Sequence, residues 1–212
     1  MTRRGLVLAL AAPLCVWVLE GCVPAAIGVA AGVGVYSAYD RRTTGAQVDD
    51  EGIELRVSNR ISERYGDRVH VNVTSYNRVV MLTGEVPNEG IRDELEKSIV
   101  GLAGVRGVTN ETQVGPNTAY SARANDSAIT GKVKARFVDA NRFNAVHVKV
   151  VTENSNVYLL GIVTEKEGND AAELARTTSG VRRVVKVFEY CQPTDDACRP
   201  REQPKSGDTK AR

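Results

Sequence analysis

The sequence predicts an α+β fold in which one small αββαβ domain occurs twice in tandem, each copy a small mixed three-stranded sheet packed on two helices. The main observation is an internal repeat. VVMLTGEV (79–86) aligns with VYLLGIV (157–163), with Gly84 on Gly161 at an offset of 77, and AGVRGV aligns with SGVRRV at an offset of 76. A second observation is that apolar spacing changes from four residues to two within each copy, which predicts a helix followed by strands.

Each copy begins with a predicted helix whose apolar residues recur four apart and so share one helix face. These residues are Ile53, Val57 and Ile61 in the first copy and Ile129, Val133 and Phe137 in the second. In the second copy, Asp126 or Ser127 is a candidate N-cap for this helix.

Two strands, a second helix and a last strand complete each copy. The first strand alternates valine with other residues, which is typical of a half-buried strand. Its valines are Val69, Val71 and Val73, or Val146, Val148 and Val150. Polar turns at 75–77 and 153–156 lead to the second strand. The second helix is predicted from Ile91, Leu95 and Ile99, or Ala171, Ala175 and Thr178, and the last strand follows a Gly-Val-Arg sequence.

These elements divide the chain into six segments. We expect a signal peptide, a Gly/Ala-rich tether, the first domain, a linker, the second domain and a polar, disordered tail, at 1–21, 22–47, 48–115, 116–124, 125–190 and 191–212.

The first residues have the pattern of a secretory signal peptide. Two arginines precede an apolar run over 6–19, which is shorter than the ~20 residues of a spanning helix. The sequence LEGC (19–22) resembles the bacterial lipobox, in which the cysteine is acylated. Val23 follows it, whereas Asp there would favour retention in the inner membrane. We therefore expect a palmitate-type lipid anchor on Cys22; ordinary cleavage near Gly21 is the alternative.

The two copies resemble BON domains. The resemblance is carried by NDSAITGKVKARF, VHVKVVTENSNVYLLGIVTEKEG and SGVRRV in the second copy, and by DRRTTGAQVDDEGIELRVSNRI in the first. The last of these is similar to the dual-BON lipoproteins of Gram-negative bacteria. The resemblance covers 22–190 and implies an outer-membrane lipoprotein that faces the periplasm, binds anionic phospholipid and supports envelope integrity.

No catalytic motif is evident in the sequence. The two histidines, His70 and His147, alternate with the inward valines, so both are expected to be solvated, and a paired metal or pH-sensing role is the alternative. There is no Cys/His cluster, P-loop or G-x-S-x-G motif. We therefore expect a protein that is not an enzyme, with no cofactor, no metal and no nucleic-acid partner.

Charge separates the two copies. Residues 48–115 contain eight Lys/Arg against twelve Asp/Glu, a net charge of −4, whereas 125–190 contain ten against eight, a net charge of +2. This favours the second copy for anionic headgroups; surface drift after duplication is the alternative.

The first helix of the second copy supplies the candidate phospholipid-binding surface. A second stripe lies away from its core face, is weakly polar and has basic edges, as interfacial helices do. Its residues are Ala128, Gly131, Lys132, Ala135, Arg136 and Val138. Many BON sequences have Trp where this chain has Ala128, so an aromatic anchor is missing there. Contact with the first copy is the alternative for this stripe, and a protein-interaction adaptor that docks an envelope assembly or cell-wall partner is the alternative function.

Two cysteines remain near the end of the chain. Cys191 and Cys198 have six residues between them, and a proline, Pro193 or Pro200, follows each of them two positions later. In an oxidising compartment they predict a small disulfide loop outside both cores. Two free thiols are the alternative.

Overall fold

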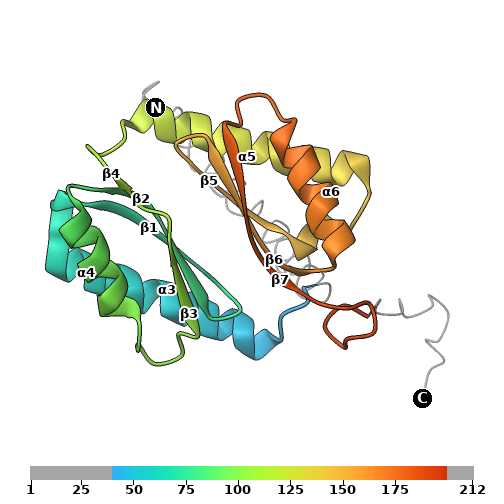
Figure 1. Ribbon diagram of the computed structural model, residues 1–212, viewed down its shortest axis with the longest axis horizontal. Helices are drawn as coiled ribbons and strands as arrows, with labels where there is room; N and C mark the ends of the chain where they lie inside the picture. Colours follow the sequence, from blue (N-terminus) through green and yellow to red (C-terminus); the bar gives the residue numbers. More distant parts are fainter. Residues whose placement is uncertain (1–39, 200–212) are drawn as a thin grey trace, which may run out of the picture. The chain divides into compact units, whose positions relative to one another are not determined.

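The computed structural model describes residues 40–199, and the signal peptide, Cys22 and 200–212 lie outside the described residues. The first copy consists of α3 (Thr44–Tyr65), η1 (Gly66–Arg68), β1 (His70–Tyr76), β2 (Val79–Val86), α4 (Glu89–Ile99), β3 (Gly107–Asn110) and β4 (Gln113–Val114). The second consists of α5 (Tyr120–Ala140), η2 (Ala145–His147), β5 (Lys149–Glu153), β6 (Asn156–Val163), α6 (Glu165–Arg176) and β7 (Arg183–Tyr190). Figure 1 shows both copies.

Each copy has the predicted mixed sheet with its second strand in the centre. β2 pairs antiparallel with β1 and parallel with β3, and β6 pairs in the same two ways with β5 and β7. The predicted α+β class and αββαβ order are therefore confirmed. The first sheet also has the short strand β4, which pairs parallel with the end of β2 and was not predicted.

The aligned glycines are explained by a close approach of two strands. A Cβ atom on Gly84 would lie 2.0 Å from the carbonyl oxygen of His70, and one on Gly161 would lie 2.3 Å from that of His147. No side chain fits at these distances, so both copies require glycine where the second strand passes the carbonyl oxygen of the histidine.

A buried aspartate in the first helix of each copy holds the β-hairpin turn. Asp126 accepts hydrogen bonds from the backbone N–H groups of Asn154 and Ser155, at 2.8 Å each. Both turn residues have positive φ, as a two-residue type I′ hairpin requires. Asp50 accepts the equivalent bonds from Asn77 and Arg78. The prediction that Asp126 or Ser127 caps the helix was wrong, because α5 begins at Tyr120.

Each copy buries its own core between its sheet and its two helices. The first core includes the predicted Ile53, Val57 and Ile61, and the second includes Ile129, Val133 and Phe137, none more than 5% exposed. Thr178 is buried but lies beyond the end of α6, where Leu174 rather than Thr178 continues the apolar face.

The two sheets are also buried on their second faces, which the prediction of one buried face did not foresee. A third cluster joins residues of both copies: Tyr76, Met81, Tyr158, Leu160, Ile162 and Cys198. In Figure 1 the helix pairs α3/α4 and α5/α6 lie on the outer sides of the two sheets. Every residue of β6 is buried, which is the pattern of a strand covered on both faces.

Polar contacts between the copies surround this third cluster. They join Glu54 to Lys149, Asn72 to Glu153, Asn77 to Glu189 and Glu111 to Arg183, at 2.6 to 3.2 Å. Before α3, Arg41 donates two hydrogen bonds to the Glu167 carboxylate and one to the carbonyl oxygen of Ile162. The two domains therefore form a jointly packed unit.

Three expected segment boundaries differ from the structure. α3 takes in 44–47 from the expected tether, and α5 takes in 120–124 from the expected linker. At the other end, residues 191–199 form turns rather than the expected disordered tail. The structure pairs Cys191 with Cys198, and Cys198 is 3% exposed in the third cluster, so this loop does not lie outside the packed interior as expected.

Candidate lipid-binding surface

The outward side of α5 has the weakly polar composition that the sequence predicted. Five of the six candidate residues are exposed: Ala128, Gly131, Lys132, Ala135 and Val138. Val138 is 66% exposed although it is apolar. At 100° per residue these side chains share one side of the helix, and Lys132 and Lys134 lie near its opposite edges. We call these five residues, together with Lys134 and Tyr120, the α5 surface.

Tyr120 is an aromatic member of the α5 surface that the sequence interpretation missed. It is 86% exposed in the first turn of α5, and at 100° per residue it lies in the same direction as Val138. The Arg123 guanidinium lies 5.0 Å from the centre of its ring. Tyrosine is one of the two aromatic residues that are enriched at membrane–water interfaces. The missed signal was the length of α5, because the sequence interpretation began this domain at 125.

Arg136, the sixth candidate, is committed to the fold. Its guanidinium donates to the Leu174 carbonyl oxygen at 2.8 Å, and to the hydroxyl oxygens of Thr177 and Thr178 at 2.9 and 3.0 Å. Arg60, the equivalent residue of the first copy, donates to the Ser98 carbonyl oxygen at 2.8 Å. Both arginines therefore satisfy carbonyl groups near the end of the second helix, a role that any helix C-terminus requires.

The equivalent helix of the first copy has the opposite charge. α5 contains four basic and two acidic residues, a net charge of +2, whereas α3 contains three and five, a net charge of −2. On α5, Asp126 is buried under the hairpin turn, so Asp139 near the end of the helix is its one exposed carboxylate. The α5 surface is therefore the more suitable of the two for an anionic partner.

The prediction that both histidines are solvated was wrong. The side chains of His70 and His147 are 15% and 14% exposed, because each sits beside a carboxylate. His70 Nδ1 lies 2.9 Å from Glu85, and His147 Nδ1 lies 3.5 Å from Glu167. Burial raises the pKa of Glu167, but His147 and the hydrogen bonds from Arg41 outweigh it and lower that pKa overall. Within residues 40–199, His70, Glu85 and Glu153 form a group that could hold a metal ion.

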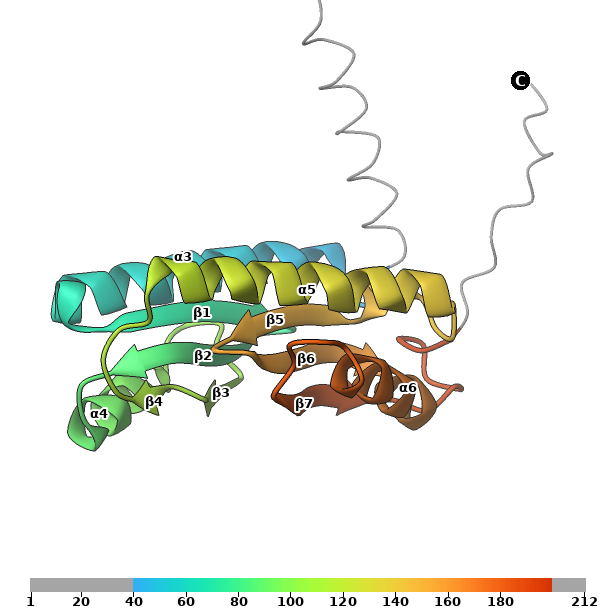
Figure 2. The same cartoon turned by 90° about the horizontal axis from the view of Figure 1, so that it is seen from above.

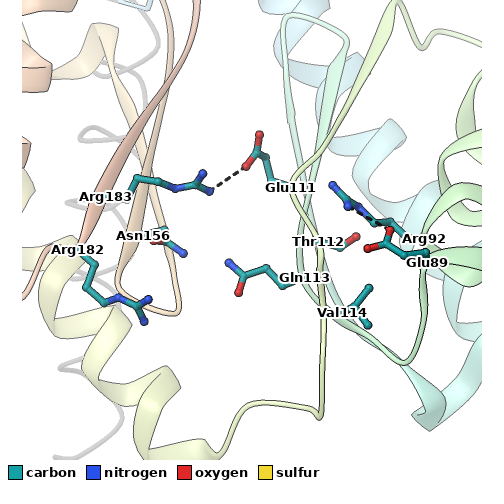
Figure 3. Close-up of a pocket in the computed structure, with 9 residues that line it drawn as sticks. All are labelled: Glu89, Arg92, Glu111, Thr112, Gln113, Val114, Asn156, Arg182 and Arg183. Carbon is teal, nitrogen blue, oxygen red and sulfur yellow. Dashed lines mark hydrogen bonds and ion pairs between the residues drawn. The ribbon is translucent and has the colours of Figure 1, made fainter.

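A polar groove of about 620 Å³ lies between the two copies (Figure 3). Its lining residues are Glu89, Arg92, Glu111, Thr112, Gln113, Val114, Asn156, Arg182 and Arg183. Arg183 pairs with Glu111 at 3.2 Å, and Arg92 pairs with Glu89 at 3.3 Å. Among the described residues, Arg182 has no ion-pair partner and points into this groove. The groove is therefore suited to a polar or anionic group.

Comparison with known proteins identifies the family. The model of the BON domain matches the chain twice, at 49–116 and 125–192. The chain belongs to the BON domain family. The tandem BON architecture that the sequence resembled is thereby confirmed.

Three relatives extend the similarity of this BON protein. It is 41% identical over 174 residues to "Outer membrane lipoprotein DolP" of Haemophilus influenzae, and the aligned region covers 81% of this chain and 90% of the relative. It is 34% identical over 155 residues to "21 kDa hemolysin" of Actinobacillus pleuropneumoniae, covering 72% and 80%. It is 28% identical over 141 residues to "Osmotically-inducible protein Y" of Escherichia coli, covering 65% and 70%.

A weaker similarity is to CdsD, a structural protein of the type III secretion system of Chlamydia trachomatis. Its C-terminal domain covers 66% of this chain with 13% identity and a TM-score of 0.28. None of the helices within residues 40–199 of this BON protein is long and apolar enough to cross a membrane.

Proposed function

We propose that the protein is a non-enzymatic lipoprotein of the outer membrane that binds anionic phospholipid through its second BON copy and helps maintain the integrity of that membrane. The observation that carries this proposal is the α5 surface, with its exposed small side chains, Val138 and Tyr120, and lysines at both edges. The 41% identity to a protein named as an outer membrane lipoprotein supports the location. The lipobox-like sequence at Cys22 supports the lipid anchor. In this proposal the anchored protein faces the periplasm.

The composition of the α5 surface fits a helix that lies flat at the headgroup level. Small residues at 128, 131 and 135 let the helix backbone approach the bilayer closely. Tyr120 and Val138 then insert at the boundary between headgroups and acyl chains, while Lys132 and Lys134 reach the phosphates. Each basic residue near an anionic surface contributes about 1 kcal/mol, so binding through this surface alone is weak.

The acyl anchor compensates for that weak affinity. An anchor on Cys22 keeps the BON copies close to one leaflet, which raises the effective concentration of lipid around α5. The α5 surface then determines which lipids the protein contacts, and the anchor determines which membrane it occupies.

Vesicle sedimentation of residues 41–199 tests the proposal, because this part of the chain lacks the acyl anchor and packs as one compact unit. We expect co-sedimentation with vesicles of anionic phospholipid, weaker binding as salt is raised, and no binding to vesicles of zwitterionic phospholipid. Equal recovery with both kinds of vesicle, or with neither, would contradict the proposal.

A protein-interaction adaptor is the second candidate function, and the groove between the copies favours it. Both copies contribute arginine and glutamate side chains to this groove, which would suit a polar peptide of an envelope assembly or cell-wall partner. Vesicle binding distinguishes the two functions, since an adaptor would bind neither anionic nor zwitterionic vesicles. Arg182→Glu, which lies in the groove and not on α5, should leave vesicle binding unchanged if lipid binds through the α5 surface.

A further inference from the structure

We propose that His70, Glu85 and Glu153 form a binding site for one first-row divalent metal ion of the zinc type, which links the two BON copies. The three residues come from β1 and β2 of the first copy and from the end of β5 in the second. One nitrogen or oxygen atom of each lies within 4.8 Å of the other two. The residue types, one imidazole and two carboxylates, are ligands that Zn²⁺ accepts.

The geometry of the group is close to that of a metal site. His70 and Glu85 are directly opposite each other on paired strands, and His70 Nδ1 lies 2.9 Å from Glu85 Oε2. Two ligand atoms of a tetrahedral zinc ion, each about 2.0–2.1 Å from the metal, are about 3.3 Å apart. Small side-chain rotations that draw in the Glu153 carboxylate are therefore sufficient for three-fold coordination.

Other residues orient the two carboxylates, as neighbours of metal ligands do. Asn72 donates from Nδ2 to Glu153 Oε2 at 2.6 Å. Thr118 donates from its backbone N–H to Glu85 Oε2 at 3.1 Å, and its hydroxyl donates to Glu85 Oε1. Each carboxylate therefore has a fixed direction before any metal ion arrives.

Burial of both carboxylates favours a cation at this place. Glu85 and Glu153 are only 5% and 6% exposed. Among the described residues no lysine or arginine pairs with either glutamate, so a bound cation would supply the missing positive charge.

The second copy provides an internal comparison. His147 occupies the equivalent strand position, but its neighbour Glu167 is already neutralised by Arg41, with hydrogen bonds of 2.6 and 3.0 Å. The residue that corresponds to Glu85 at an offset of 77 is Ile162, which is not a ligand. The second copy has therefore lost, or never had, the features of a metal site.

A hollow of about 270 Å³ gives the proposed site a route to solvent. Its lining residues are His70, Asn72, Arg123, Asp126, Ser127, Thr130, Thr152 and Glu153. Water from this hollow can complete the coordination of an ion that has three protein ligands. Because the ligands belong to both copies, the bound ion would hold the two sheets together.

Metal titration of the full chain tests the site. We propose to strip the lipidated chain of metal in detergent micelles, without reductant, and to titrate it with Zn²⁺ by calorimetry and with Co²⁺ by visible absorption. We expect one ion per chain and a thermal midpoint that rises with Zn²⁺ concentration. Loss of a residue that orients a metal ligand typically weakens metal binding about 10–100-fold. Glu153→Gln removes a ligand itself, so it should weaken Zn²⁺ binding by at least that much. His147→Asn is the matched control and should bind as the wild type does.

Two further variants separate the site from side effects. Asn72→Ala keeps all three ligands and removes only the hydrogen bond to Glu153, so binding should weaken about 10–100-fold without unfolding. Cys191→Ser with Cys198→Ser should leave Zn²⁺ binding unchanged. No uptake of Zn²⁺ or Co²⁺ by the wild type would overturn the proposal. So would uptake that Glu153→Gln and Asn72→Ala leave unaltered.

Discussion

Charge reversal of the two lysines at the edges of the α5 surface is expected to abolish binding to anionic vesicles and leave the fold intact. Lys132 and Lys134 are exposed, and neither has an ion-pair partner among the described residues. Each contributes about 1 kcal/mol near an anionic surface, and its replacement by glutamate turns that attraction into a similar repulsion. Lys132→Glu with Lys134→Glu therefore changes the binding free energy by about 4 kcal/mol, which is close to a 10³-fold loss of affinity.

The matched control has the same change of charge on the equivalent helix of the other copy. Arg56→Glu with Arg64→Glu alters two exposed side chains of α3. Arg56 makes an exposed hydrogen bond to the Ala103 carbonyl oxygen, and Arg64 makes an exposed ion pair with Glu94. Exposed pairs contribute about 0–1 kcal/mol, so this control should also fold. Both variants of 41–199 would be measured by vesicle sedimentation at low and high salt, with circular dichroism to check folding. Equal loss of binding in both variants, or none in the α5 variant, would refute the assignment of lipid binding to α5.

Three further predictions follow from the described contacts and the lipobox. Arg136→Ala should lower the free energy of unfolding by about 1.5–3 kcal/mol, the usual contribution of hydrogen bonds to a charged group, as measured in urea. Glu153→Gln should stabilise the metal-free protein at neutral pH and lose this advantage below pH ~4.5, because a raised carboxyl pKa favours folding at low pH and that contribution is lost as pH rises; pH-dependent thermal melts check this. Cys22→Ala should remove the protein from the outer-membrane fraction, and its normal recovery there would contradict the lipid anchor.

The sequence was sufficient to predict the fold because the duplication marks equivalent positions twice. The aligned glycines, the apolar spacing of the first helices and the Gly-Val-Arg sequences each occur in both copies, so each element had two independent supports. The physical reason for the glycine also repeats, since Gly84 and Gly161 both face the carbonyl oxygen of a histidine at a distance that excludes Cβ.

The packing of one sheet on the other could not be derived in the same way, although its signal is present. VYLLGIV is apolar at odd and even positions alike, which indicates a strand that is buried on both faces. The sequence does not say what covers the second face. Cys198 and Tyr76 lie 122 residues apart in the chain, and only the folded structure shows that they share a cluster. The prediction of solvated histidines was wrong for the same reason, because the sequence does not show which side chains cover them.

The α5 surface was predicted in its small residues and missed at its edges. Periodicity gives the direction of a side chain from a helix, but it does not show which carbonyl groups a long side chain can reach. Arg136 was therefore grouped with Lys132, although its guanidinium satisfies the end of α6. Tyr120 was missed because helix boundaries are the least certain part of a sequence interpretation.

Paramagnetic broadening by spin-labelled lipid tests the central claim most directly. Amide resonances of 41–199 would be recorded by NMR with anionic bicelles that carry a spin label at headgroup depth. We predict that broadening is strongest along the outward side of α5, from Tyr120 to Val138, and is absent from α3 and from the groove around Arg182. Broadening centred on that groove or on α3, or no broadening with anionic bicelles, would contradict the claim that the second BON copy binds the membrane through α5.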